Sequence, residues 1–183
     1  SPSRGLGDVY KRQAINPDTG ELYTADDMTV INWNDVGVAM LQDAIWADGD
    51  KLASDEAYQD ITTRFVAASL EGWAHCRDHS DECVEHVLNN GSALGTSHQT
   101  WQMNEINALI WPSPDGVGMI DADQWAQTID VVTNYGDLEA VPAEDAYTNE
   151  YAEAANDILD SKAISTTGSD WTRATVTLNE GGE

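Results

Sequence analysis

Residues 30–47, VINWNDVGVAMLQDAIWA, decide the fold expected of this chain, because a short apolar run meets a polar cluster and then a second apolar run. Val30 and Ile31 are β-branched and follow a turn-rich segment, which predicts a short buried strand. Open α/β sheets bind ligands at the ends of their strands. The side chains that follow this strand are therefore candidate ligand-binding residues: Asn32, Trp33, Asn34 and Asp35. The local pattern alone favours another interpretation, in which Asn34 or Asp35 caps a turn of helix and Trp33 belongs to the core.

Two further features suggest edge strands. Residues 173–178, RATVTL, alternate polar and apolar side chains as a short edge strand does. Asp43 interrupts the second apolar run of residues 30–47. We interpret it as the solvent-facing residue of an edge strand, and the alternative is an acid that reaches a ligand.

The rest of the chain is patterned as helices. The predicted helices cover residues 55–79, 80–88, 97–111, 121–135 and 149–160. Ser80 and Asp121 are the expected N-caps of the second and fourth helices, and Gly136 is expected to end the fourth. In the first helix, apolar or small residues recur at spacings of three and four: Tyr58, Ile61, Phe65, Ala68, Gly72 and Cys76. With Val66, Leu70 and Trp73 beside it, this stripe is wide enough to predict a central helix that is buried on more than one side.

The charge of the chain excludes some partners. The 183 residues carry a net charge of −25, with only eight lysines and arginines. Non-specific binding to nucleic acid or to an anionic membrane needs many more cations, so we expect neither partner. No apolar run reaches the length of roughly 18 residues that a membrane helix needs, so we expect no membrane insertion. The acids are scattered through helical patterns, which indicates a solvated acidic surface.

The first thirteen residues, SPSRGLGDVYKRQ, differ from the rest in having a positive charge balance and no periodicity. They resemble translated adapter sequence at the end of a metagenomic reading frame. We therefore expect residues 1–13 to be disordered or loosely packed, and we set them aside in predicting the fold.

The segment HCRDHSDECVEH contains both cysteines, Cys76 and Cys83, together with three histidines. A zinc site would need the ligands on one face, but the turn expected at residues 78–81 breaks that register. A disulfide between Cys76 and Cys83 is favoured, free thiols come second, and a metal site comes last.

No arrangement in the sequence argues for catalysis. We find no Ser/His/Asp order, no glycine-rich phosphate loop and no paired carboxylates at an apparent site. Catalytic residues, metal ligands and cofactors are therefore not expected.

Four blocks in this order carry a family resemblance: VINWNDVGVAMLQDAIWA, FVAASLEGWAHCRDHSDECVEHVL, SHQTWQMNEINALIWPSPDGVGMID and DQWAQTIDVVTNYG. Together, over residues 14–178, they resemble the C-terminal half of ABC-transporter solute-binding proteins, in the group that binds nitrate, sulfonates, taurine and thiamine-pyrimidine precursors. The resemblance implies an α/β fold, as the C-terminal fragment of a two-lobed type II periplasmic-binding protein, mainly helical here with a few short strands.

The same resemblance implies a division of the chain and a location. Residues 14–34 would be the remnant of the second lobe and the crossing between lobes, and residues 35–183 would be the C-terminal part of the first lobe, with residues 41–47 as a strand. The expected partners are a small solute and an ABC permease of the inner membrane. The expected location is periplasmic or at the cell surface, with the signal sequence in a missing N-terminal half.

Two alternatives remain. One is an enzyme of similar fold that makes the thiamine pyrimidine, whose cysteine-rich iron-binding motif is not found in this sequence. The other is an all-α interaction domain, which explains the predicted helices without the resemblance.

Overall fold

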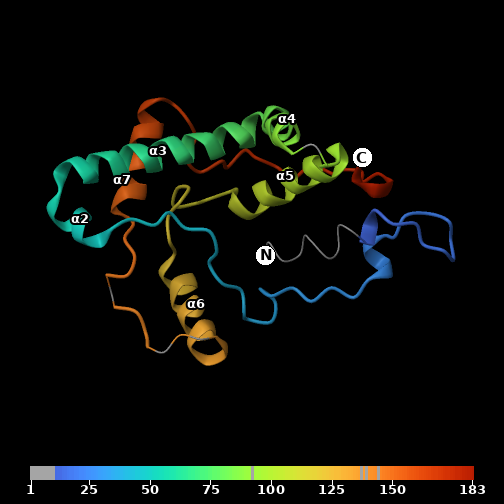
Figure 1. Cartoon of the computed structure of the whole chain (residues 1–183), viewed down its shortest axis with the longest axis horizontal. Coiled ribbons are helices and arrows are strands. Elements are labelled where there is room, and N and C mark those ends of the chain that lie inside the picture. The colour runs from blue at the N-terminus through green and yellow to red at the C-terminus, as the bar shows by residue number, and fades with distance from the viewer. Residues whose placement is uncertain (1–10, 92, 137, 139, 144) are drawn as a thin grey trace. The chain divides into compact units, whose positions relative to one another are not determined.

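The computed structural model describes the whole chain except residues 1–10, 92, 137, 139 and 144. Its elements follow one another as short helices and longer ones (Figure 1): η2 (Ala25–Asp27), α2 (Gly49–Ser54), α3 (Glu56–Asp78), α4 (Ser80–Asn90), α5 (Thr96–Ile110), α6 (Ala122–Tyr135), α7 (Glu150–Ser161) and η3 (Glu180–Gly182). The helices from α3 to α7 lie where the sequence predicts them.

The helix ends agree with the sequence in part. Asp121 caps α6, because its carboxylate accepts a hydrogen bond from the Gln124 N–H at 2.8 Å, and Gly136 ends that helix. The prediction for Ser80 is wrong, since His79 occupies the N-cap position of α4 and Ser80 is the first helical residue.

The expected α/β fold is wrong. Throughout the described residues there is no sheet, and the one β-bridge pairs Ile15 with Leu22. Residues 30–31, 41–47 and 173–178, each expected to be a strand, have no strand partner among the described residues. Local alternation predicted these segments, but a strand also needs a neighbour for its backbone hydrogen bonds.

The chain divides into two compact units. Unit 1 comprises the described part of Ser1–Val36, together with His75–Pro112 and Ser169–Glu183. Unit 2 comprises Gly37–Ala74 and Ser113–Gly168. Each unit draws on separated stretches of sequence, and α3 begins in unit 2 and ends in unit 1.

In unit 1, α4 packs against α5, and α5 also contacts η3. Trp101 of α5 is buried with Leu178, and Val176 packs beside them. Asn104 holds the neighbouring extended segment, because its side-chain amide donates to the Ala174 carbonyl at 3.0 Å and accepts from the Ala174 N–H at 2.9 Å. Residues 173–178 are thus positioned partly by an asparagine side chain that takes the place of a neighbouring strand.

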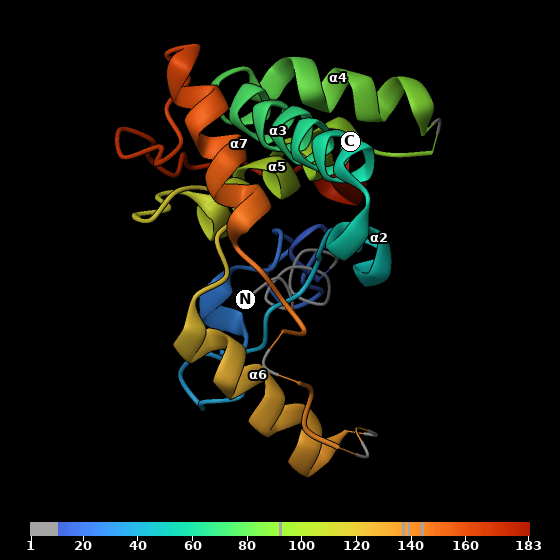
Figure 2. The ribbon, with the colours of Figure 1, turned by 90° about the vertical axis from the view of Figure 1, so that its left-hand side faces the viewer.

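In unit 2, α7 lies beside α3 (Figure 2), and Lys162 forms an ion pair with Glu71. Ala155 and Leu159 of α7 are completely buried. Asn156 anchors the loop before α6 by donating to the Val117 carbonyl at 3.0 Å. Apolar burial and side-chain-to-backbone bonds together hold this unit.

The α3 stripe, defined as Tyr58, Ile61, Phe65, Ala68 and Gly72, is not buried as the sequence predicts. Ile61 is 54% exposed and Phe65 is 60% exposed, and Ala68 and Gly72 are also at least partly exposed. The buried residues of α3 in unit 2 lie on a different face: Thr62, Val66, Ala67, Leu70 and Ala74. The helix is amphipathic around its buried face, and its second apolar face meets solvent.

Candidate functional site

The polar cluster of residues 32–35 forms an exposed turn. The Asn32 side-chain oxygen accepts a hydrogen bond from the Asn34 N–H at 3.1 Å, and the Asn32 carbonyl accepts from the Asp35 N–H at 3.0 Å. This is the local backbone bonding that asparagine favours in turns. Gly37 follows at a φ of 74°, in the left-handed region that glycine adopts without strain. Asn32 therefore builds the turn rather than pointing an unused amide oxygen at a ligand.

The turn presents an aromatic ring beside two polar side chains. Trp33 is 48% exposed, and Asn34 and Asp35 are exposed. The interpretation of Trp33 as a core residue is therefore wrong, and the next helix, α2, starts only at Gly49, so neither Asn34 nor Asp35 caps one. A half-exposed indole can stack on a flat group, while an amide and a carboxylate beside it can form hydrogen bonds.

Asp43 adopts a left-handed backbone with a φ of 57° and is exposed. A regular edge strand has negative φ values, so the edge-strand interpretation of Asp43 is wrong. Aspartate tolerates this conformation better than most residues. The structure does not bring Asp43 to any defined site.

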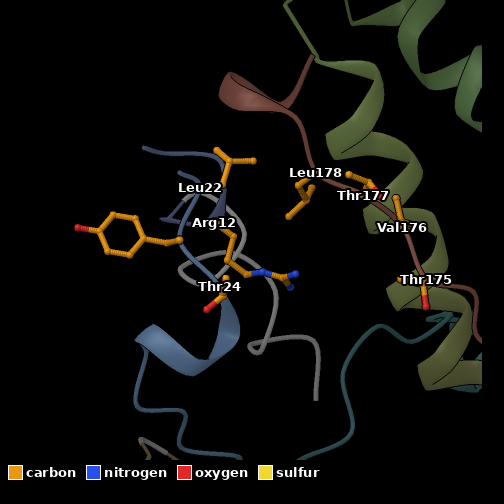
Figure 3. A pocket seen from close by; sticks show the side chains of 8 residues that line it. Arg12, Leu22, Thr24, Thr175, Val176, Thr177 and Leu178 are labelled. Atoms are coloured by element: carbon orange, nitrogen blue, oxygen red, sulfur yellow. The ribbon is translucent and has the colours of Figure 1, made fainter. Parts of the chain in front are cut away.

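A cavity of about 290 Å³ lies in unit 1 between residues 22–24 and residues 175–178. Figure 3 shows the side chain of Arg12 extending into this space, with Leu22 on one side and Val176 and Leu178 on the other. Hydroxyl groups complete the lining: Tyr23, Thr24, Thr175 and Thr177. The volume is at the lower end of the range for ligand pockets, and an arginine with hydroxyls and apolar walls suits a small anion.

The sequence did not reveal this cavity. The alternation in residues 173–178 marks Thr175 and Thr177 as one face of an extended segment, but it does not say what lies opposite. Arg12 belongs to the opening segment that the sequence sets apart, so we assign no binding role to the cavity. The expectation of disorder or loose packing in that segment falls mostly on residues 1–10, which lie outside the described residues, whereas Gln13 at its end is 6% exposed and its side chain bonds to His98. Thr24 is already engaged, because its N–H and its hydroxyl both donate to Asp27, which lowers the pKa of that carboxyl.

Cys76 and Cys83 form a disulfide, the state that the sequence favours over free thiols and a metal site. The neighbouring histidines share one carboxylate: His75 Nε2 lies 3.2 Å and His79 Nδ1 lies 3.8 Å from Glu82 oxygens. Their rings stack with centroids 4.7 Å apart. Ring nitrogens bind metals in the plane of the ring, so stacked rings are a poor chelate. Within the described residues, no group of three or more histidines, cysteines and carboxylates can hold a metal ion.

Arg77 and Asp78 form a close ion pair in unit 1, at the end of α3. Arg77 donates two hydrogen bonds to the Asp78 carboxylate, at 2.7 and 2.8 Å. These bonds lower the pKa of Asp78 below its ordinary value, and its partial burial opposes that shift. Arg77 itself is buried, so this pair stabilises the helix end rather than offering a reactive group.

Comparison with known proteins adds no identification. No protein-family model matches the chain, and neither the curated proteins nor the solved structures contain a match. Among the described residues, the helices are too short or too polar to cross a bilayer. Function therefore rests on the sequence blocks and on the geometry of the turn.

Proposed function

We propose that this chain takes part in capturing a small solute and delivering it to an ABC permease. The observation that carries the proposal is the order of the four sequence blocks, which resembles that of solute-binding proteins. The proposal makes no use of the two-lobed α/β fold. The exposed turn at residues 32–35 supports it, because residues selected from the sequence as ligand contacts are accessible there.

In this proposal, each residue of the turn has its own role. Trp33 stacks on a flat or apolar part of the solute, and Asn34 and Asp35 form hydrogen bonds to its polar groups. Asn32 positions the other three by holding the backbone of the turn. No covalent chemistry takes place, so the chain is proposed to be a binding protein rather than an enzyme.

The proposed location is the periplasm or the cell surface. The Cys76–Cys83 disulfide supports an oxidising compartment, since structural disulfides are rare in the reducing cytosol. The acidic surface supports solubility outside the cell but says nothing about the solute.

Isothermal titration with taurine, nitrate and hydroxymethylpyrimidine tests the proposal. We expect one of these probes to bind, and Trp33→Ala to weaken binding by roughly tenfold, because base-like stacking on an aromatic ring contributes about 1–3 kcal/mol. Trp46→Ala is the matched control, since Trp46 is 87% exposed and lies outside the turn. No binding by any probe, or equal binding by the Trp33 and Trp46 variants, would contradict the assignment.

A second candidate function is a helical interaction domain. The observation that favours it is the exposed apolar face of α3, with Phe65 60% exposed. It predicts that residues 14–183 alone unfold in one cooperative thermal transition, whereas a gradual transition would contradict it.

A further inference from the structure

The α3 stripe has the spacing of a helix-pairing seam. Its residues follow one another at intervals of three, four, three and four: Tyr58, Ile61, Phe65, Ala68 and Gly72. Apolar residues at this spacing lie along one line of a helix and pack against a second helix in coiled coils. In this chain the line is accessible to solvent from Ile61 to Gly72. The stripe is therefore uncovered from Ile61 to Gly72, whereas Tyr58 is half-buried and its hydroxyl accepts a hydrogen bond from the Asp48 N–H.

The side chains of the stripe are large toward one end of α3 and small toward the other. The large residues Ile61 and Phe65 lie toward the start of α3, and the small residues Ala68 and Gly72 lie toward its end. Two such helices in antiparallel orientation would place Phe65 of each against Ala68 of the other, and Ile61 against Gly72. The stripe is thus complementary in shape to a second copy of itself.

Gly72 supports this use of the stripe. A Cβ added to Gly72 would meet no atom within 4 Å, so nothing in its described surroundings requires a glycine. Glycine inside a helix lowers the stability of that helix relative to alanine. Packing against a second helix explains the glycine, because a large side chain of that helix needs the space above Gly72.

The charged residues beside the stripe also suit an antiparallel pair of α3 helices. Arg64 and Glu71 are seven residues apart, so they lie on the same flank of the helix. In the antiparallel pair, Arg64 of one copy faces Glu71 of the other, twice. Their partners within the chain, Asp60 and Lys162, make this edge balanced in charge.

We propose that two copies of this chain associate through an antiparallel pair of α3 helices, with the α3 stripe at the contact. A basic partner would match the net charge but not the balanced edge of the stripe, and a second copy matches both its sizes and its charges. The two net charges repel each other over distances that salt screens. Association therefore strengthens as salt concentration rises. It does not depend on solute capture, because its residues lie outside the turn at residues 32–35.

Sedimentation equilibrium of the full chain between about 0.1 and 1 M NaCl tests the proposal, a range over which the Debye length falls from about 10 to 3 Å. We expect a monomer–dimer equilibrium whose dissociation constant falls with salt. Gly72→Leu should raise that constant by roughly tenfold or more, because its side chain fills the space needed by Ile61 of the second copy. Val87→Leu is the control, since Val87 is an exposed apolar residue on α4.

A charge exchange tests the orientation of the helices. Arg64→Glu should weaken the dimer by placing a second carboxylate opposite Glu71, and adding Glu71→Arg should restore it. Circular dichroism of each variant confirms that its helices are retained. A monomer at every salt concentration, a dimer unaffected by Gly72→Leu, or no restoration in the double variant would each overturn the proposal.

Discussion

The guanidinium of Arg77 lies over the indole ring of Trp111, with Arg77 Cζ 4.5 Å from the ring centroid. The Trp111 residue is only 2% exposed and the Arg77 side chain only 5%. The cation is therefore removed from water, and the ring and the Asp78 carboxylate compensate for its lost hydration. This contact joins the end of α3 to the residue that follows α5.

Replacing Arg77 by lysine should lower the free energy of unfolding by about 1–2 kcal/mol, because an ammonium keeps the charge but loses the planar stack and the paired hydrogen bonds. Urea denaturation measures the change. Arg64→Lys is the control, since Arg64 is exposed and pairs with Asp60 at the surface, where the exchange should cost less than about 0.5 kcal/mol. Equal losses in the two variants would show that the stack contributes nothing.

Stability should fall when Asp78 is protonated. The pKa of Asp78 is lower in the folded protein than its ordinary value of 3.8, so its contribution is fully present above that value and is lost as pH falls through the lower, folded pKa. Because about half of the side chain is exposed, we expect an effect below about 1 kcal/mol. Asp78→Asn should flatten the pH dependence of urea denaturation below about pH 4. A pH dependence of Asp78→Asn equal to that of the unaltered protein would contradict this role of Asp78.

Reduction of the disulfide should destabilise unit 1. Cys76 and Cys83 are seven positions apart, so the disulfide closes a short loop. On the chain-entropy account, removing this cross-link should lower the free energy of unfolding by about 2 kcal/mol. The measurement is urea denaturation with and without reductant. The double variant Cys76→Ser, Cys83→Ser should lose a similar amount and should no longer respond to reductant. A reductant effect that persists in the double variant would exclude the disulfide as its cause.

Asn149 connects the start of α7 to the loop before α6. Its side-chain oxygen accepts from the Ile120 N–H at 2.8 Å, and its amide nitrogen donates to the Ile120 carbonyl at 3.0 Å. Asn149→Ala removes both bonds from a partly buried site and should cost about 1–3 kcal/mol.

Asn149→Asp separates the two bonds, because the carboxylate keeps the acceptor and loses the donor. It should also destabilise the protein, since it places a negative charge beside the Ile120 carbonyl. Asn134→Ala is the control, because Asn134 is exposed and bonds to Asp130 within its own helix, α6. Thermal melting compares the three variants, and a loss confined to Asn134→Ala would contradict the role of Asn149.

The helices could be predicted from the sequence because their signals are local. The predicted range of residues 121–135, with the expected N-cap at Asp121 and the expected end at Gly136, matches α6 almost to the residue. Strands could not be predicted in that way, because alternation such as that of residues 173–178 does not identify the neighbouring strand to which the segment would have to bond. For the same reason the prediction that the α3 stripe is buried was wrong, because the spacing of apolar residues marks a face but does not show what covers it. The pairing of Cys76 with Cys83 needed no such information, since the chain has two cysteines.

The candidate turn at residues 32–35 was visible in the sequence as a set of residue types, but their division of labour was not. Asparagine at position 32 bonds its own backbone, whereas asparagine at position 34 is exposed, and the two look alike in the sequence. The cavity lined by Leu22 and Leu178 depends on two segments from distant parts of the chain. Only the fold brings these segments together.

Unit 1 is built from segments far apart in the sequence, and this determines when it can fold during synthesis. Leu178 is buried with Trp101, and the Gly181 N–H donates to the Gln13 carbonyl, so residues synthesised late complete contacts with residues synthesised much earlier. A chain that emerges from the ribosome in order leaves Trp101 uncovered until residues around Leu178 have cleared the exit tunnel. Unit 1 must therefore finish folding after these residues emerge, and a ribosome stalled before Ser169 would hold a nascent chain in which a chaperone could bind Trp101.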